Sequence, residues 1–184
     1  MLTKNIYAKN TSELLTDINF YFNSLDEFSA SFIQENDNSL QEGYLYKNDK
    51  RIRVDYILPS KITIILDKNK AMFFNHDLNE VEYFNPKKTI AKIIFDIFNN
   101  SSVEQFDRYT IQDNHCIFYI TLELDDLLYR IETVFETKPL QLRLVKIDYE
   151  GESLSFGLKD HNFNYIFDKN FFSMAYPVKD QSLN

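Results

Sequence analysis

Alternation of apolar and polar residues dominates the chain and predicts a series of β-strands. Ile52, Val54 and Tyr56 fall on one face of such a segment, and charged residues occupy the positions between them. Successive side chains of a strand point to opposite faces, so this period of two is typical of a strand with one buried face. The same pattern recurs at 28–33, 43–46, 61–66, 71–74, 81–83, 118–122, 130–135, 140–144 and 154–158. Local polar turns join these segments, which favours an antiparallel sheet.

Two segments follow helical spacing instead. Between residues 10 and 25 apolar positions recur every three or four residues, which predicts an amphipathic helix. A second helix is predicted over 89–100, and its apolar face is formed by Ile90, Ile93, Ile94, Ile97 and Phe98. That face needs a surface to cover. We therefore predict a single α+β domain over residues 1–184, a curved antiparallel sheet that is solvated outside and covered on its apolar concave face by two helices.

Charge narrows the range of partners. The chain has 20 Lys and Arg against 28 Asp and Glu, a net charge of -8. Nucleic acids and anionic membranes require a cationic surface, so neither is an expected partner. No run of apolar residues is long enough to span a membrane, and the first residues lack the apolar core of a signal peptide. The single cysteine, Cys116, is expected to be a buried small apolar residue on a strand.

Candidate catalytic and metal-binding groups are sparse. His76, His115 and His161 lie in polar, turn-like contexts without metal-ligand spacing and are expected to be exposed. We therefore predict no metal site.

The acidic cluster of Glu123, Asp125 and Asp126 is expected to be a solvated hairpin end, although a polar cleft around it would favour an enzyme. Glycine occurs only at positions 43, 151 and 157, so no glycine-rich phosphate loop is possible. We predict no catalytic residues, no cofactor and no enzymatic activity.

Three stretches carry a resemblance to a known family. They read FSASFIQ at 28–34, GYLYK at 43–47 and RIRVDYILP at 51–59. Together they resemble the LolA family of periplasmic lipoprotein carriers, whose N-terminal half reads approximately F-S-A-x-F-x-Q, G-x-L-W-x-K-R-P and x-F-R-W-x-Y-x-x-P. The helix after Pro86 falls where that family has a lid helix, and FFSMAYP at 171–177 is similar to its C-terminal strand.

The resemblance implies an unclosed β-barrel whose helices form a lid over an apolar cavity. It implies a monomeric periplasmic carrier that takes lipoprotein acyl chains from an inner-membrane lipoprotein-releasing ABC transporter to an outer-membrane receptor lipoprotein. The lid would be formed by Ile90, Ile93, Ile94, Ile97 and Phe98. The residues expected to line the cavity are Ile52, Val54, Tyr56, Ile62, Ile64, Leu66, Leu140, Leu142 and Leu144.

Two alternatives stay open at the level of sequence. The same scaffold could bind a free fatty acid or another small lipid without a protein partner. Alternatively, the interior could be packed solid, as in a structural or interaction module, with no internal void. The pattern of apolar and polar residues does not distinguish a filled interior from a hollow one.

One departure from the family pattern generates a prediction. The family's lid-fastening Arg of K-R-P matches Asn48, and its Pro matches Asp49. Loss of the Arg contact should weaken the closed lid, so we expect tighter cargo retention or a more open resting form. Asn48→Arg should therefore lower the affinity for a fluorescent acyl probe measured by titration. Equal affinities of the variant and the wild type would contradict this prediction.

Overall fold

The computed structural model describes residues 4–36, 39–99, 102–112 and 114–175, and most of them belong to one large sheet. The helices are α1 (Lys4–Asn23), η1 (Pro86–Lys88), α2 (Ile90–Asn99) and η2 (Val103–Gln105). The strands are β1 (Phe28–Asn36), β2 (Ser39–Lys47), β3 (Ile52–Leu58), β4 (Ile62–Leu66), β5 (Ala71–Asn75), β6 (Glu80–Phe84), β7 (Arg108–Gln112), β8 (His115–Leu124), β9 (Leu127–Thr137), β10 (Leu140–Tyr149) and β11 (Glu152–Asn162).

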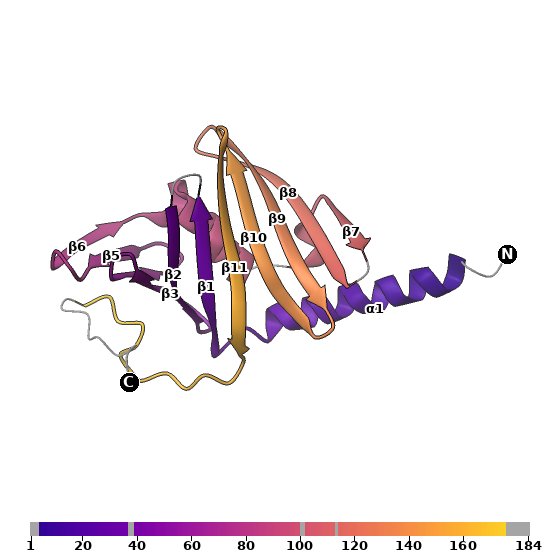
Figure 1. Ribbon diagram of the computed structural model, residues 1–184, viewed down its shortest axis with the longest axis horizontal. Helices are drawn as coiled ribbons and strands as arrows, with labels where there is room; N and C mark the ends of the chain where they lie inside the picture. Colours follow the sequence, from indigo (N-terminus) through magenta and orange to yellow (C-terminus); the bar gives the residue numbers. More distant parts are fainter. Residues whose placement is uncertain (1–3, 37–38, 100–101, 113, 176–184) are drawn as a thin grey trace.

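The sheet consists of two antiparallel meanders joined at its centre. Its strand order is β6-β5-β4-β3-β2-β1-β11-β10-β9-β8-β7. The chain runs outward from β1 to β6, crosses through α2 to the opposite edge at β7, and returns to place β11 beside β1 (Figure 1). β6 and β7 form the two ends of this order and are not hydrogen-bonded to each other, so the curved sheet is an unclosed barrel.

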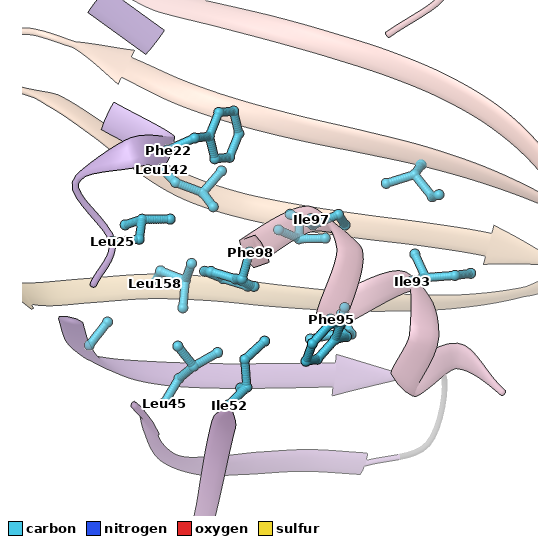
Figure 2. Packing of buried hydrophobic residues seen from close by; sticks show 14 of the residues in the cluster. Phe22, Leu25, Leu45, Ile52, Ile93, Phe95, Ile97, Phe98, Leu142 and Leu158 are labelled. Atoms are coloured by element: carbon cyan, nitrogen blue, oxygen red, sulfur yellow. The ribbon is translucent and has the colours of Figure 1, made fainter. Parts of the chain in front are cut away.

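The main core lies between the inner face of this sheet and the two helices. Tyr21, Phe22 and Leu25 enter it from α1 and its C-terminal end, and all five buried residues of α2 belong to it. Figure 2 shows side chains of both helices and of the sheet meeting in one cluster, to which Phe98 and Leu158 both belong. The predicted arrangement of helices over an apolar sheet face is therefore confirmed.

Three elements differ most clearly from the sequence-based prediction. α1 covers Lys4–Asn23 rather than 10–25. β7 was not predicted because four of its five residues are exposed, which leaves no apolar alternation to detect. Residues 171–175 form turns and irregular chain instead of a strand, and the remaining positions of that expected strand, 176 and 177, lie outside the described residues.

The outer face of β2–β5 is covered rather than solvated, which corrects the expectation of a wet outer surface. Phe171 and Phe172 of the C-terminal segment 163–175 pack against Tyr46. Further along the same segment, Met174 packs against a cluster of β4 and β5 residues. This half of the sheet is therefore packed on both faces, which explains why Ile65 and Leu66 are both buried.

A buried ion pair fastens the C-terminal segment to the sheet. Arg53 and Asp55, expected on the solvated face, are 1% and 3% exposed. Arg53 Nε donates to both carboxylate oxygens of Asp55 at 2.9 Å, and its Nη1 donates to the Phe171 carbonyl at 2.8 Å. Thr63 Oγ1 also donates to Asp55, at 2.7 Å. Because a buried charge is tolerated only when it is paired and hydrogen-bonded, these contacts make the segment part of the fold.

The remaining candidate groups behave as structural residues. Cys116 is fully buried on β8, as predicted, and burial raises the pKa of its thiol to about 11. Glu123, Asp125 and Asp126 are exposed at the end of the β8–β9 hairpin, as predicted. Among the described residues no group of three or more His, Cys, Asp or Glu side chains could hold a metal ion.

Two of the three histidines are not in the expected exposed positions. His115 is exposed, but His76 and His161 are half-buried. The His161 ring meets the Phe28 ring edge to face at 5.4 Å, and its two nitrogens have no hydrogen-bond partner. Burial, reinforced by the nearby Arg143 charge, lowers the pKa of His161 to about 4.

Gly43 provides a sharp test of the packing between β1, β2 and β3. A Cβ at this position would collide with the Asp55 carbonyl oxygen and lie 2.8 Å from the Phe32 ring, whereas one at Gly157 would have its nearest neighbour at 3.8 Å. Gly43→Ala should lower the free energy of unfolding in urea by about 3 kcal/mol, and Gly157→Ala should change it by less than about 0.5 kcal/mol. Equal effects of the two substitutions would contradict this packing.

His161 should make the fold sensitive to acid. Its pKa is lower in the folded chain than in the unfolded chain, so stability from this group is present above pH 6.5 and is lost as the pH falls toward 4. We expect a loss of about 2 kcal/mol from this residue, measured as the change in urea unfolding free energy between the two pH values. His161→Phe should remove that part of the loss, whereas His115→Gln should keep the full pH dependence.

Candidate functional site

An apolar cavity of about 240 Å³ lies between the inner face of the sheet and α2. Its walls come from β1–β4 on one side, from β10 and β11 on another, and from α2 with the residues that precede it. The lining residues are Phe32, Leu45, Val54, Tyr56, Ile64, Leu66, Phe84, Thr89, Ile90, Ala91, Ile94, Phe98, Val145, Phe156 and Leu158. A cavity of this composition excludes water more readily than it holds it.

Strand register explains how residues distant in sequence meet on one wall. Val54 of β3 pairs with Leu45 of β2 and with Ile64 of β4. Directly opposed residues in an antiparallel sheet project from the same face, so these three side chains form one row. Tyr56 and Leu66 extend this wall in opposite directions along the strands.

Four of the nine residues expected to line the cavity do so: Val54, Tyr56, Ile64 and Leu66. Ile52 and Leu142 share the inner face but are fully buried in the main core. Ile62 and Leu140 are partly exposed and do not line the cavity.

The expectation for Leu144 is wrong because β10 carries a bulge. Its pairing with β9 shifts between Leu142 and Leu144, so Arg143 is an extra residue in the ladder. Leu144 then pairs with Val134, whose strand neighbours on both sides are buried inner-face residues. The bulge therefore turns Leu144 outward and brings Val145 into the cavity wall.

The predicted lid residues of α2 divide between two tasks. Ile90, Ile94 and Phe98 line the cavity, together with Ala91. Ile93 and Ile97 are buried in the main core and do not reach the cavity lining. One face of the helix thus closes the cavity while an adjacent face anchors the helix.

Several lining residues were not predicted, although most of them stand at positions that the sequence pattern marks as apolar. Phe32, Leu45, Phe156 and Leu158 stand at apolar positions of strands that the alternation does identify. The alternation does not show which end of a strand faces a void. Phe84 lies on an edge strand with little periodicity, so its contribution required the structure.

The ion pairs of the α2 region are exposed or half-buried. Lys88, just before α2, pairs with Asp125 of the β8–β9 hairpin at 2.8 Å, and both side chains are largely exposed. Lys92 pairs with Asp96 within the helix itself. Exposed ion pairs contribute little stability, so apolar packing provides most of the attachment of α2.

Asn48, at the position of the family's Arg, has a local role. Its side-chain oxygen accepts hydrogen bonds from the backbone N–H groups of Lys50 and Arg51 at 2.9 and 2.7 Å. These bonds shape the β2–β3 turn. α2 is docked in this structure although the Arg is absent, and the tighter retention expected from Asn48 stays a prediction.

Comparison with known proteins identifies the family. The family model described as outer membrane lipoprotein carrier protein LolA matches residues 23–175, which is most of the chain. The chain belongs to the LolA family. The chain therefore has the lipid-binding carrier fold of this family, with a helical lid over an apolar cavity. No curated protein sequence matches the chain.

Two solved structures with TM-scores of 0.50 or more agree on the fold at low sequence identity. An uncharacterized conserved protein from Thermus thermophilus has a TM-score of 0.52 and 8% identity, with 85% of this chain and 90% of that chain covered. A DUF1329 family protein from Desulfovibrio piger has a TM-score of 0.50 and 8% identity, with 88% and 97% covered. The Pseudomonas aeruginosa MucA/MucB complex has a TM-score of 0.46 and 12% identity, with 82% and 56% covered.

Proposed function

We propose that this LolA-family protein is a periplasmic carrier that shields the acyl chains of lipoproteins from water. It would receive them from an inner-membrane ABC transporter and deliver them to an outer-membrane receptor lipoprotein. The observation that carries the proposal is an apolar cavity closed by a helix that is attached mainly through apolar contacts. No helix among the described residues is long and apolar enough to cross a membrane.

The size of the cavity supports a lid that moves. A cavity of about 150 Å³ admits one benzene-sized molecule, so the 240 Å³ found here can hold only a short part of one acyl chain. A lipoprotein with three chains requires more room. α2 would therefore have to leave its position for such cargo to enter.

Competition between the lid and the cargo would keep binding reversible. Burial of each methylene group is worth about 0.8 kcal/mol, so fully enclosed chains would bind too tightly to be released. When cargo displaces the apolar face of α2, the net affinity falls by the lid contacts that are broken. The empty protein regains those contacts when the cargo leaves.

A second candidate function is the binding of a single-chain lipid such as a free fatty acid. The cavity in its present form favours it, because one short chain segment fits without movement of α2. The alternative of a solid-core interaction module predicts no void, which does not agree with the cavity. Neither candidate requires a catalytic group, a cofactor or a metal, and we propose that the protein acts as a monomer without enzymatic activity.

Shortening one anchoring side chain of the lid should tighten ligand binding. Ile97 is buried in the core without lining the cavity, so Ile97→Val weakens the docking of α2 and leaves the cavity wall unchanged. The substitution removes about 0.5–1.5 kcal/mol of packing, which predicts up to about tenfold tighter binding of a synthetic triacylated lipopeptide. Binding is measured by displacement of phenylnaphthylamine, an uncharged fluorescent dye.

Ile33→Val is the matched control, because Ile33 lies on the outer face of β1 and is 38% exposed. Its affinities should equal those of the wild type. Circular dichroism verifies that both variants are folded. The absence of saturable dye uptake by the wild type, or unchanged lipopeptide affinity in folded Ile97→Val, would contradict the proposed carrier mechanism.

A further inference from the structure

A short chain of polar side chains interrupts the apolar inner face at one end of the cavity. Tyr56 Oη donates to Gln34 Oε1 at 2.6 Å, and Gln34 Nε2 donates to Gln41 Oε1 at 2.8 Å. Gln34 is only 8% exposed, although glutamine is usually a surface residue. We call these three residues the Tyr56–Gln34–Gln41 cluster.

Strand pairing places this cluster next to the cavity. Gln34 opposes Phe156 on β11, and Phe156 lines the cavity. Tyr56 is itself a lining residue, and its ring meets the Phe32 ring edge to face at 5.2 Å. This level lies four residue steps along β3 from the level of Leu66, a length of about 13 Å. The cavity therefore has one polar end and one apolar end.

The hydrogen bonds within the cluster leave capacity for a ligand. Gln34 uses one of its two amide hydrogens, and the Gln41 amide contributes two more donors. The Tyr56 oxygen donates its hydrogen and can still accept a bond. Burial raises the pKa of Tyr56 to about 12, so the phenol stays protonated and uncharged at neutral pH.

The cavity lining and the sheet row that contains the cluster carry no charge that could compensate an anion. None of the described residues that line the cavity is charged. The inward-facing row that crosses the sheet through Gln34 is also uncharged and consists of Gln41, Gln34, Phe156, Val145, Thr133 and Phe118. Lys88, adjacent in sequence to the lining residue Thr89, is exposed and already paired with Asp125. Burial of a carboxylate without a partner costs far more than burial of a neutral amide whose hydrogen bonds are made.

We propose that the Tyr56–Gln34–Gln41 cluster binds the polar head of an acyl ligand and selects a neutral amide or ester over a carboxylate. This inference rests on the proposed acyl-binding function and deepens it. The amide or ester carbonyl accepts from the glutamine N–H groups, an amide N–H donates to the Tyr56 oxygen, and the hydrocarbon tail runs toward Leu66. N-acyl and ester-linked chains satisfy this requirement, whereas a free fatty acid does not.

The test compares ligands that differ only in the head. Displacement of phenylnaphthylamine is measured for N-methyldodecanamide, methyl dodecanoate and dodecanoate at about pH 8, where the acid is ionised. We expect the wild type to bind the amide and the ester at least about tenfold more tightly than dodecanoate. In Gln34→Leu and in Tyr56→Phe this ratio should fall to about threefold or less, with each ligand affinity corrected for that variant's own affinity for the dye.

Gln141→Leu is the control, because Gln141 lies on the outer face of β10 and should leave the ratio unchanged. Tyr56→Phe removes a single oxygen and keeps the test valid if Gln34→Leu does not fold. Dodecanoate binding as tightly as the amide would overturn the inference and would point instead to the N-terminus of α2 as the head site. An unchanged ratio in both cluster variants would also overturn it. A wild-type protein that takes up dye normally but binds all three ligands equally refutes this inference alone, whereas a wild-type protein that takes up neither dye nor amide refutes the carrier function.

Discussion

Packing of the isoleucine face of α2 against the inner face of the sheet is the contact on which the rest of the structure depends. The sheet ends at β6 and β7 without closing, and α2 lies on the chain segment that connects these two edges. Without the helix, the inner face would present a large apolar surface to water, which soluble proteins rarely tolerate. The same helix that completes the core therefore also forms one wall of the cavity.

The two walls of the cavity differ in how firmly they are held. The β2–β5 wall is supported from outside by residues 163–175, which are fastened through Arg53 and through Arg51, whose Nη1 donates to the Phe172 carbonyl at 2.7 Å. The ion pairs of the α2 region, Lys88 with Asp125 and Lys92 with Asp96, are exposed or half-buried by comparison. A ligand that needs space should therefore displace the helix and leave the sheet in place.

The sequence predicts most of the fold, because period-two alternation and a spaced isoleucine stripe are local signals. It fails where a residue's face depends on distant partners. The bulge at Arg143 reverses the direction of Leu144, and nothing in a run of alternating leucines reveals it. Arg53 and Asp55 have the pattern of a solvated face, and only the return of the C-terminal segment buries them. Only four of the nine expected lining residues reach the cavity. Alternation identifies the inner face, but three-dimensional packing decides where that face is hollow.

The free energy needed to detach α2 bears on the kind of cargo that the proposed carrier would admit. Five α2 side chains are buried, and exposure of each costs about 2 kcal/mol, so complete detachment of the helix costs about 10 kcal/mol. One acyl chain with about a dozen methylene groups gains a similar amount by burial, which leaves little net drive to open the lid. Several chains on one cargo molecule exceed that cost, because their gains add while the helix is displaced only once. On the proposed function, a lid of this strength would favour multiply acylated cargo over single-chain lipids, and the polar end of the cavity would add selection by head group to this selection by chain number.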